Sequence, residues 1–110
     1  MREIKAIIRP DRLSDVVYAL RQIPHMPGVT VSVVQGFGRG DVQQTPGMEP
    51  VVEAQFAKVE TVVPFALAKQ VIEAIRRAAH TGRPGDGKIF VIPVDIVTRI
   101  STGEEGEEAI

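Results

Sequence analysis

The stretch PFALAKQVIEAIRRAAHTGRPGDGKIFVIPV, residues 64–94, decides the fold of this 110-residue chain. Over residues 65–79 its apolar side chains recur at spacings of three and four, which predicts a helix with one buried face. The glycine-rich loop 81–87 ends this helix, and the apolar run that follows predicts a strand over residues 88–94. Another strand, over residues 51–63, precedes the helix, so this half of the chain is a strand–helix–strand unit.

The first half of the chain shows the same order. We predict a strand over residues 3–9, a helix over residues 10–23 and a strand over residues 29–35. Residues 95–100 are expected to form a short helical turn, and residues 101–110, STGEEGEEAI, a solvated acidic tail. Two strand–helix–strand units predict an α+β, ferredoxin-like βαββαβ fold, in which an antiparallel four-stranded sheet carries both helices on one face.

The predicted strands carry apolar residues on both faces. Ile7 and Ile8 are adjacent, as are Val33 and Val34, and residues 90–92 form a continuous apolar run. Strands of this kind are buried on both sides, yet two helices can cover only one face of the sheet. The sequence therefore predicts that another copy of the chain covers the second face, in a homo-oligomer.

The composition of the chain argues against several classes of function. The net charge of −1 argues against nucleic-acid binding through bulk electrostatics, and the absence of cysteine excludes disulfides and thiol catalysis. No run reaches the roughly 18 apolar residues of a membrane-spanning helix, and the charged start MREIKAIIRP does not fit a signal peptide. We expect a single domain over residues 1–110 and a cytoplasmic location.

Two loops are candidates for function. Residues 36–50 are glycine-rich and polar without periodicity, which is typical of a long functional surface loop. In TGRPGDGKIF, residues 81–90, the glycines can expose backbone N–H groups to phosphate oxygens, and Lys88 adds a positive charge. The spacing is not that of a Walker A loop, and taken by itself this stretch favours a helix stop and a tight turn.

Four stretches together resemble the PII signal-transduction family, and the resemblance extends over nearly the whole chain. They are IKAIIRPDRLSDVVYAL, VTVSVVQGFGRG, TGRPGDGKIFV and TRISTGEEGEEAI. The resemblance implies a homotrimer of ferredoxin-like subunits that binds ATP or ADP in clefts between subunits. It also implies three named segments: a T-loop at about residues 38–50, a B-loop at residues 81–88 and a C-terminal segment at residues 96–110. Such proteins are sensors rather than enzymes, and the T-loop docks on a partner, which is a membrane transporter or an enzyme.

The resemblance also assigns residues. Adenine lies near residues 30, 60 and 62, phosphates lie on the B-loop, and Arg99 reaches the phosphates from a neighbouring subunit. The nucleotide-binding residues implied are Thr30, Gly38, Arg39, Glu60, Val62, Gly85, Asp86, Gly87, Lys88, Phe90 and Arg99. The partner-binding residues implied are Asp41, Val42, Gln43, Gln44, Thr45, Pro46, Gly47, Met48 and Glu49. No catalytic and no metal-ligating residue is predicted.

The chain departs from the family pattern at several positions. Ser101 replaces the second of two phosphate-binding arginines, so ADP or AMP is expected to compete well with ATP. Gly40 replaces a glutamine that helps to hold Mg²⁺ and 2-oxoglutarate, and Phe56 replaces a lysine that pairs with a 2-oxoglutarate carboxylate. Lys58 lies two residues further along and on the same strand face. The T-loop is shorter by about three residues and contains no tyrosine or serine, so covalent control of the usual kind is not expected.

Three functional hypotheses remain at this point. The first is a PII-like regulator in nitrogen control, which a partner recruits to the membrane if that partner is a transporter. The second is a PII-like paralogue outside nitrogen control, which regulates a metal-efflux or inorganic-carbon transporter without sensing 2-oxoglutarate. The third is an enzyme on the same scaffold, such as a small phosphatase. Such an enzyme would need a catalytic arginine–asparagine pair or a phosphorylated histidine. The absence of any asparagine weighs against the first, and turnover assays would test the second.

Overall fold

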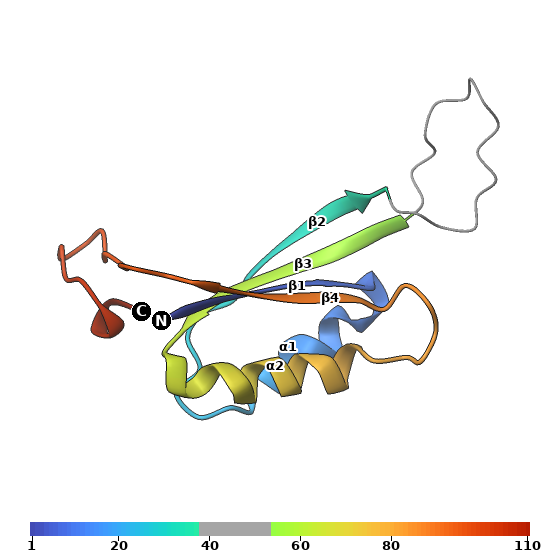
Figure 1. Cartoon of the computed structure of the whole chain (residues 1–110), viewed down its shortest axis with the longest axis horizontal. Helices are drawn as coiled ribbons and strands as arrows, with labels where there is room; N and C mark the ends of the chain where they lie inside the picture. Colours follow the sequence, from blue (N-terminus) through green and yellow to red (C-terminus); the bar gives the residue numbers. More distant parts are fainter. Residues whose placement is uncertain (38–53) are drawn as a thin grey trace, which may run out of the picture.

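The computed structural model describes residues 1–37 and 54–110. The elements are β1 (Arg2–Ile8), the 3-10 turn η1 (Pro10–Arg12), α1 (Leu13–Arg21), β2 (Thr30–Gly36), β3 (Ala54–Val63), α2 (Phe65–Ala79), β4 (Gly87–Pro93) and the 3-10 turn η2 (Glu107–Ala109). The strands form one sheet in the order β2-β3-β1-β4, and every neighbouring pair is antiparallel. Both helices lie on one face of this sheet (Figure 1). The predicted α+β, ferredoxin-like fold is confirmed.

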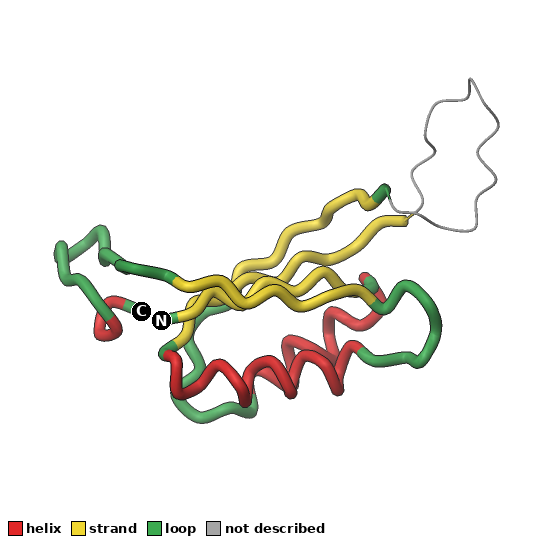
Figure 2. The backbone as a smooth tube through the Cα atoms, viewed as in Figure 1, coloured by secondary structure: helices red, strands yellow, loops and turns green. Residues whose placement is uncertain are grey.

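Alternation along the two central strands builds the core. In β1, Ile4, Ala6 and Ile8 are at most 1% exposed, and β3 buries alternate residues in the same way. These side chains pack in one cluster with Val16 of α1 and Val71 of α2. Figure 2 shows the two helices on the same side of the sheet. Each fully buried aliphatic side chain of this kind stabilises the fold by about 1.5–3 kcal/mol.

The two helices differ in how well the sequence predicted them. The helix predicted over residues 65–79 is α2, with the same bounds. The helix predicted over residues 10–23 is instead a 3-10 turn followed by a helix that ends at Arg21. Arg12, at this junction, donates hydrogen bonds from Nε and Nη2 to the carbonyl oxygen of Ala78 at 3.0 and 2.7 Å. It thereby satisfies one of the carbonyls that the last turn of α2 leaves unpaired.

The sheet face away from the helices is more polar than predicted. Register places Thr30, Glu60, Lys5 and Phe90 in one row across all four strands. The next row contains Ser32, Lys58, Ile7 and Lys88. Apolar side chains therefore share this face with three lysines and a glutamate, and 43% of the Phe90 surface is exposed in the single chain.

The helical turn predicted for residues 95–100 is wrong. The chain stays extended after β4 and then folds into a hairpin, in which Thr98 forms a bridge with Glu105. The Arg99 amide donates to the Glu104 carbonyl, and the Gly103 amide donates back to the Arg99 carbonyl, each at 2.8 Å. These bonds compete with a local helix and prevail. The predicted acidic tail is therefore folded, and Ala109 within it is buried.

Candidate functional site

The B-loop is organised around the carboxylate of Asp86. Its oxygens accept hydrogen bonds from the amides of Thr81 and Gly82 at 2.8 and 3.0 Å, and from the hydroxyl of Thr81. Arg9, at the end of β1, adds an ion pair from Nε at 3.0 Å and donates from Nη2 to the Pro84 carbonyl. The Thr81 hydroxyl and amide, and then Arg9 and the Gly82 amide, hold the pKa of Asp86 far below its ordinary value. Asp86 is therefore ionised, and the hydrogen bonds fix the shape of the loop.

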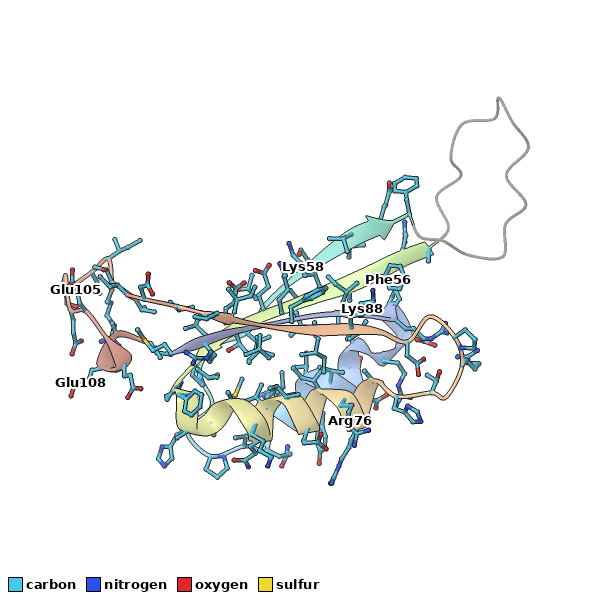
Figure 3. All side chains as sticks on the ribbon, in the orientation of Figure 1. Phe56, Lys58, Arg76, Lys88, Glu105 and Glu108 are labelled. Carbon is cyan, nitrogen blue, oxygen red and sulfur yellow. The ribbon has the colours of Figure 1, made fainter. Side chains whose placement is uncertain are left out.

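Two glycines let the B-loop return to the sheet. Gly85 has a φ of +91° and Gly87 a φ of +106°, both in the region that side chains rarely adopt. A Cβ on Gly87 would also lie 1.7 Å from the carbonyl oxygen of Ile7. Only glycine fits this contact with β1. Lys88 follows directly, pairs in register with Ile7 and lies on the face away from the helices (Figure 3).

The residues expected near adenine meet at a second place. Thr30, Glu60 and Val62 line a surface pocket of about 270 Å³ together with Glu3, Gly28 and Thr61. The buried Thr61 hydroxyl donates to the Gly28 carbonyl at 2.9 Å and ties the start of β2 to the end of β3.

Glu60 is the ionised acceptor in this pocket. A hydrogen bond with Glu3 and a second with Lys58 hold the pKa of Glu60 below its ordinary value. The Lys58 ammonium lies 3.3 Å from Glu60 Oε1. In the same row, Lys5 lies over the Phe90 ring, with 5.6 Å between Nζ and the ring centroid. Three predicted residues, Thr30, Glu60 and Phe90, thus occupy one row of the sheet.

Arg99 lies far from the B-loop. The B-loop and the C-terminal segment are at opposite ends of the molecule (Figure 1). Arg99 follows Lys88 by eleven positions of largely extended chain, which corresponds to roughly 35 Å. The Arg99 guanidinium bonds within its own segment, from Nη1 to Glu104 Oε2 at 3.2 Å and from Nη2 to the Glu108 carbonyl at 3.1 Å. No single chain brings Arg99 to the B-loop.

Phe56 occupies the base of the T-loop. It lies on the same face as Lys58 and pairs in register with Val34. Its ring covers Gly36, where an added Cβ would approach Phe56 Cε2 to 2.6 Å. An aromatic ring therefore stands where the resemblance expects the lysine, and Lys58 is occupied by its ion pair with Glu60.

Part of the predicted site lies outside the described residues. This applies to Gly38, Arg39, Gly40 and the partner-binding residues 41–49. Sequence reasoning also missed residues that the structure brings to the site, namely Arg9, Thr81, Glu3 and Glu104. Arg9 is 77 positions from Asp86, so no local pattern could have paired them. The i,i+5 spacing of Thr81 and Asp86 around four loop residues was the one available signal.

Known proteins match the chain over nearly its full length. A family model described as "Nitrogen regulatory protein P-II" matches residues 1–104. The chain is a member of the nitrogen regulatory protein P-II family. It is 48% identical to the P-II protein of Azospirillum brasilense, 49% identical to that of Rhizobium meliloti and 46% identical to that of Haemophilus influenzae, in each case over the full length of both proteins. These alignments span 113 positions against the 110 residues of this chain, which fits a chain about three residues shorter.

A solved structure gives the same result. The crystal structure of Arabidopsis thaliana PII bound to citrate superimposes with a TM-score of 0.81 at 42% identity, over 99% of this chain and 91% of the other. P-II proteins are signalling regulators, and the predicted family is confirmed. Within the parts of the chain that the structure describes, no helix is long and apolar enough to cross a membrane.

Proposed function

We propose that this P-II protein binds an adenine nucleotide between the subunits of a homotrimer and controls a partner protein through its T-loop. The observation that carries the proposal is the separation of the predicted phosphate contacts within one chain. Lys88 belongs to the B-loop and Arg99 to the C-terminal segment, and these two segments lie at opposite ends of the molecule (Figure 1). A phosphate group can touch both only if they come from different copies, placed head to tail around a closed ring.

The B-loop is preset for phosphate. Asp86 and Arg9 hold its backbone before any ligand arrives, so little ordering entropy is lost on binding. Gly85 and Gly87 bring the backbone close to the ligand without side chains, and Lys88 contributes an ammonium group at the start of β4. Asp86 acts in this proposal as a positioning residue, because its oxygens are already used within the loop and by Arg9.

The pocket lined by Thr30, Glu60 and Val62 suits the adenine base of the nucleotide. Glu60 provides an ionised acceptor, and Thr30 provides a hydroxyl that donates or accepts. A carboxylate favours a base that presents an amino group, as adenine does, over one that presents a carbonyl at the same position. Val62, which lines the same pocket, adds apolar contact area for a flat ring.

The face away from the helices supports the trimer. Phe90 and Ile92 remain 43% and 37% exposed on it in the single chain. Burying them against neighbouring copies would stabilise the assembly and would place the sheets around a common axis. Lysines and glutamates in the same rows would then pair within and between subunits.

Nucleotide exchange is the signal in this mechanism. Occupancy controls the partner only if the nucleotides differ in affinity for two arrangements of the T-loop. The target, a membrane transporter or an enzyme, would bind one arrangement. Nitrogen regulation is the role that the names of the relatives suggest for this signal.

Calorimetric titration with ATP, ADP and AMP tests the proposal. Lys88→Ala should lower the affinity for ATP about tenfold or more, because a charge-assisted contact is lost. Lys69→Ala is the matched control, since Lys69 is an exposed lysine on the outer face of α2. Light scattering should show trimers for all three proteins. Unchanged ATP affinity in Lys88→Ala would refute the phosphate role of the B-loop, and a monomeric wild type would refute the intersubunit site.

Phe56 favours a second candidate function, a P-II regulator that does not sense 2-oxoglutarate. The ring of Phe56 against Gly36 offers no charge to a carboxylate. We expect 2-oxoglutarate with Mg²⁺ to leave the ATP affinity unchanged within about twofold. An increase of tenfold or more would show that another group replaces the lysine and would restore the nitrogen-sensing role.

A further inference from the structure

The C-terminal segment carries an ion pair at the residue that is expected to meet the phosphates. Arg99 Nη1 lies 3.2 Å from Glu104 Oε2, and the exposed fractions of the two side chains are 43% and 37%. Arg99 Nη2 donates to the Glu108 carbonyl at 3.1 Å. Two of the five N–H donors of the guanidinium are therefore already used, and the carboxylate neutralises its charge.

We propose that Glu104 sets the phosphate selectivity of the site and makes it favour nucleoside mono- and diphosphates over free triphosphate. This inference rests on the proposed nucleotide site. The Glu104 carboxylate is already paired with the Arg99 guanidinium. The outer phosphates must therefore share the guanidinium with this carboxylate or displace the carboxylate from it. AMP does not reach so far, and its affinity does not depend on Glu104.

The charge of the surrounding segment points in the same direction. Residues 97–110 contain Arg99 as their only cation, together with four glutamates. Each further phosphate adds about one negative charge to the ligand, so bringing this segment to a triphosphate becomes progressively less favourable. Ser101 contributes no positive charge to offset the repulsion.

The hairpin fixes Glu104 beside Arg99. The two residues are joined by the bond from the Arg99 amide to the Glu104 carbonyl at 2.8 Å, and Gly103 makes the turn between them with a φ of +74°. The backbone conformation of the hairpin thus already brings the side chains of Arg99 and Glu104 together. Glu105, the next residue, is exposed and makes no ion pair with Arg99. Figure 3 shows Glu105 and Glu108 on the same segment.

An opposite role for Glu104 is also physically reasonable and gives the opposite result. If Glu104 orients Arg99 toward the ligand, removing its charge frees the guanidinium to move and weakens phosphate binding. The sign of the effect on ATP affinity therefore separates competition from positioning. We expect competition, because phosphates bound to Arg99 would lie close to the Glu104 carboxylate, which carries a like charge 3.2 Å from the guanidinium.

The test compares Glu104→Gln with Glu105→Gln in the full chain. Both variants remove one negative charge from adjacent residues, and glutamine keeps an acceptor for the Arg99 N–H. Titrations with ATP and with AMP are run in EDTA, so that no divalent cation offsets the phosphate charge. We expect Glu104→Gln to bind ATP about five- to tenfold more tightly, with AMP affinity unchanged within twofold. The gain should shrink in high salt.

The outcomes are distinct. Unchanged or weaker ATP binding in Glu104→Gln overturns the inference while leaving the nucleotide site intact. An equal gain in Glu105→Gln overturns the specific contact and shows a general effect of segment charge. A wild type that binds no nucleotide overturns both this inference and the proposed function. Circular dichroism and light scattering confirm that each variant folds and assembles as the wild type does.

Discussion

Gly87, at the start of β4, is where the structure leaves no room for a side chain. In Gly87→Ala the new Cβ would lie 1.7 Å from the Ile7 carbonyl oxygen, whereas such contacts are not shorter than 3.0 Å. The backbone must therefore shift by at least 1.3 Å, which opens the pairing of Gly87 with Ile8. Positive φ costs about 1–3 kcal/mol, and each lost ladder bond costs about 0.5–1.5 kcal/mol. We expect a loss of about 3 kcal/mol in the free energy of unfolding.

The control for this variant is Gly103→Ala. Gly103 also has a positive φ, +74°, but an added Cβ would meet nothing within 4 Å. It should lose only about 1 kcal/mol, the cost of the left-handed conformation. Denaturant unfolding at a fixed subunit concentration measures both variants, because assembly couples stability to concentration. A Gly87→Ala protein as stable as Gly103→Ala would refute the argument that close approach to β1 requires glycine.

Two further predictions concern the loop carboxylate and the helix end. The folded-state pKa of Asp86 is depressed, so its stabilisation is complete above about pH 4 and is lost as the pH falls below that value. Wild-type stability should therefore fall more steeply than that of Asp86→Asn between pH 4 and pH 2 in acid titrations followed by circular dichroism; parallel curves would contradict this. Arg12→Ala removes both bonds to the Ala78 carbonyl and should cost about 1–2 kcal/mol in denaturant unfolding. Arg76→Ala, which removes only an exposed i,i+3 pair with Glu73, should leave stability nearly unchanged, and an equal loss in both variants would show that the helix end does not depend on Arg12.

Local patterns were sufficient for elements whose signals lie within a few residues. The spacing of apolar residues located α2, and Pro64 and the B-loop marked its ends. Pro10 correctly ended β1, but the 3-10 geometry of the first turn after it had no signature in the pattern. For residues 95–100, Ile96, Val97 and Ile100 have a spacing that suits a helix. Bonds from residues 103–106 overrode this preference.

The sequence by itself determined the order of the helices and strands and the bounds of α2. It did so because the apolar periods of strand and helix are local properties. Only the tertiary structure decided how the site is arranged. Sheet order places β1 beside β4 and so brings Arg9 to Asp86, 77 residues away. The length of the extended chain keeps Arg99 away from Lys88, and the hairpin places Arg99 in an ion pair with Glu104. Such contacts depend on the path of the whole chain, which no short stretch of sequence contains.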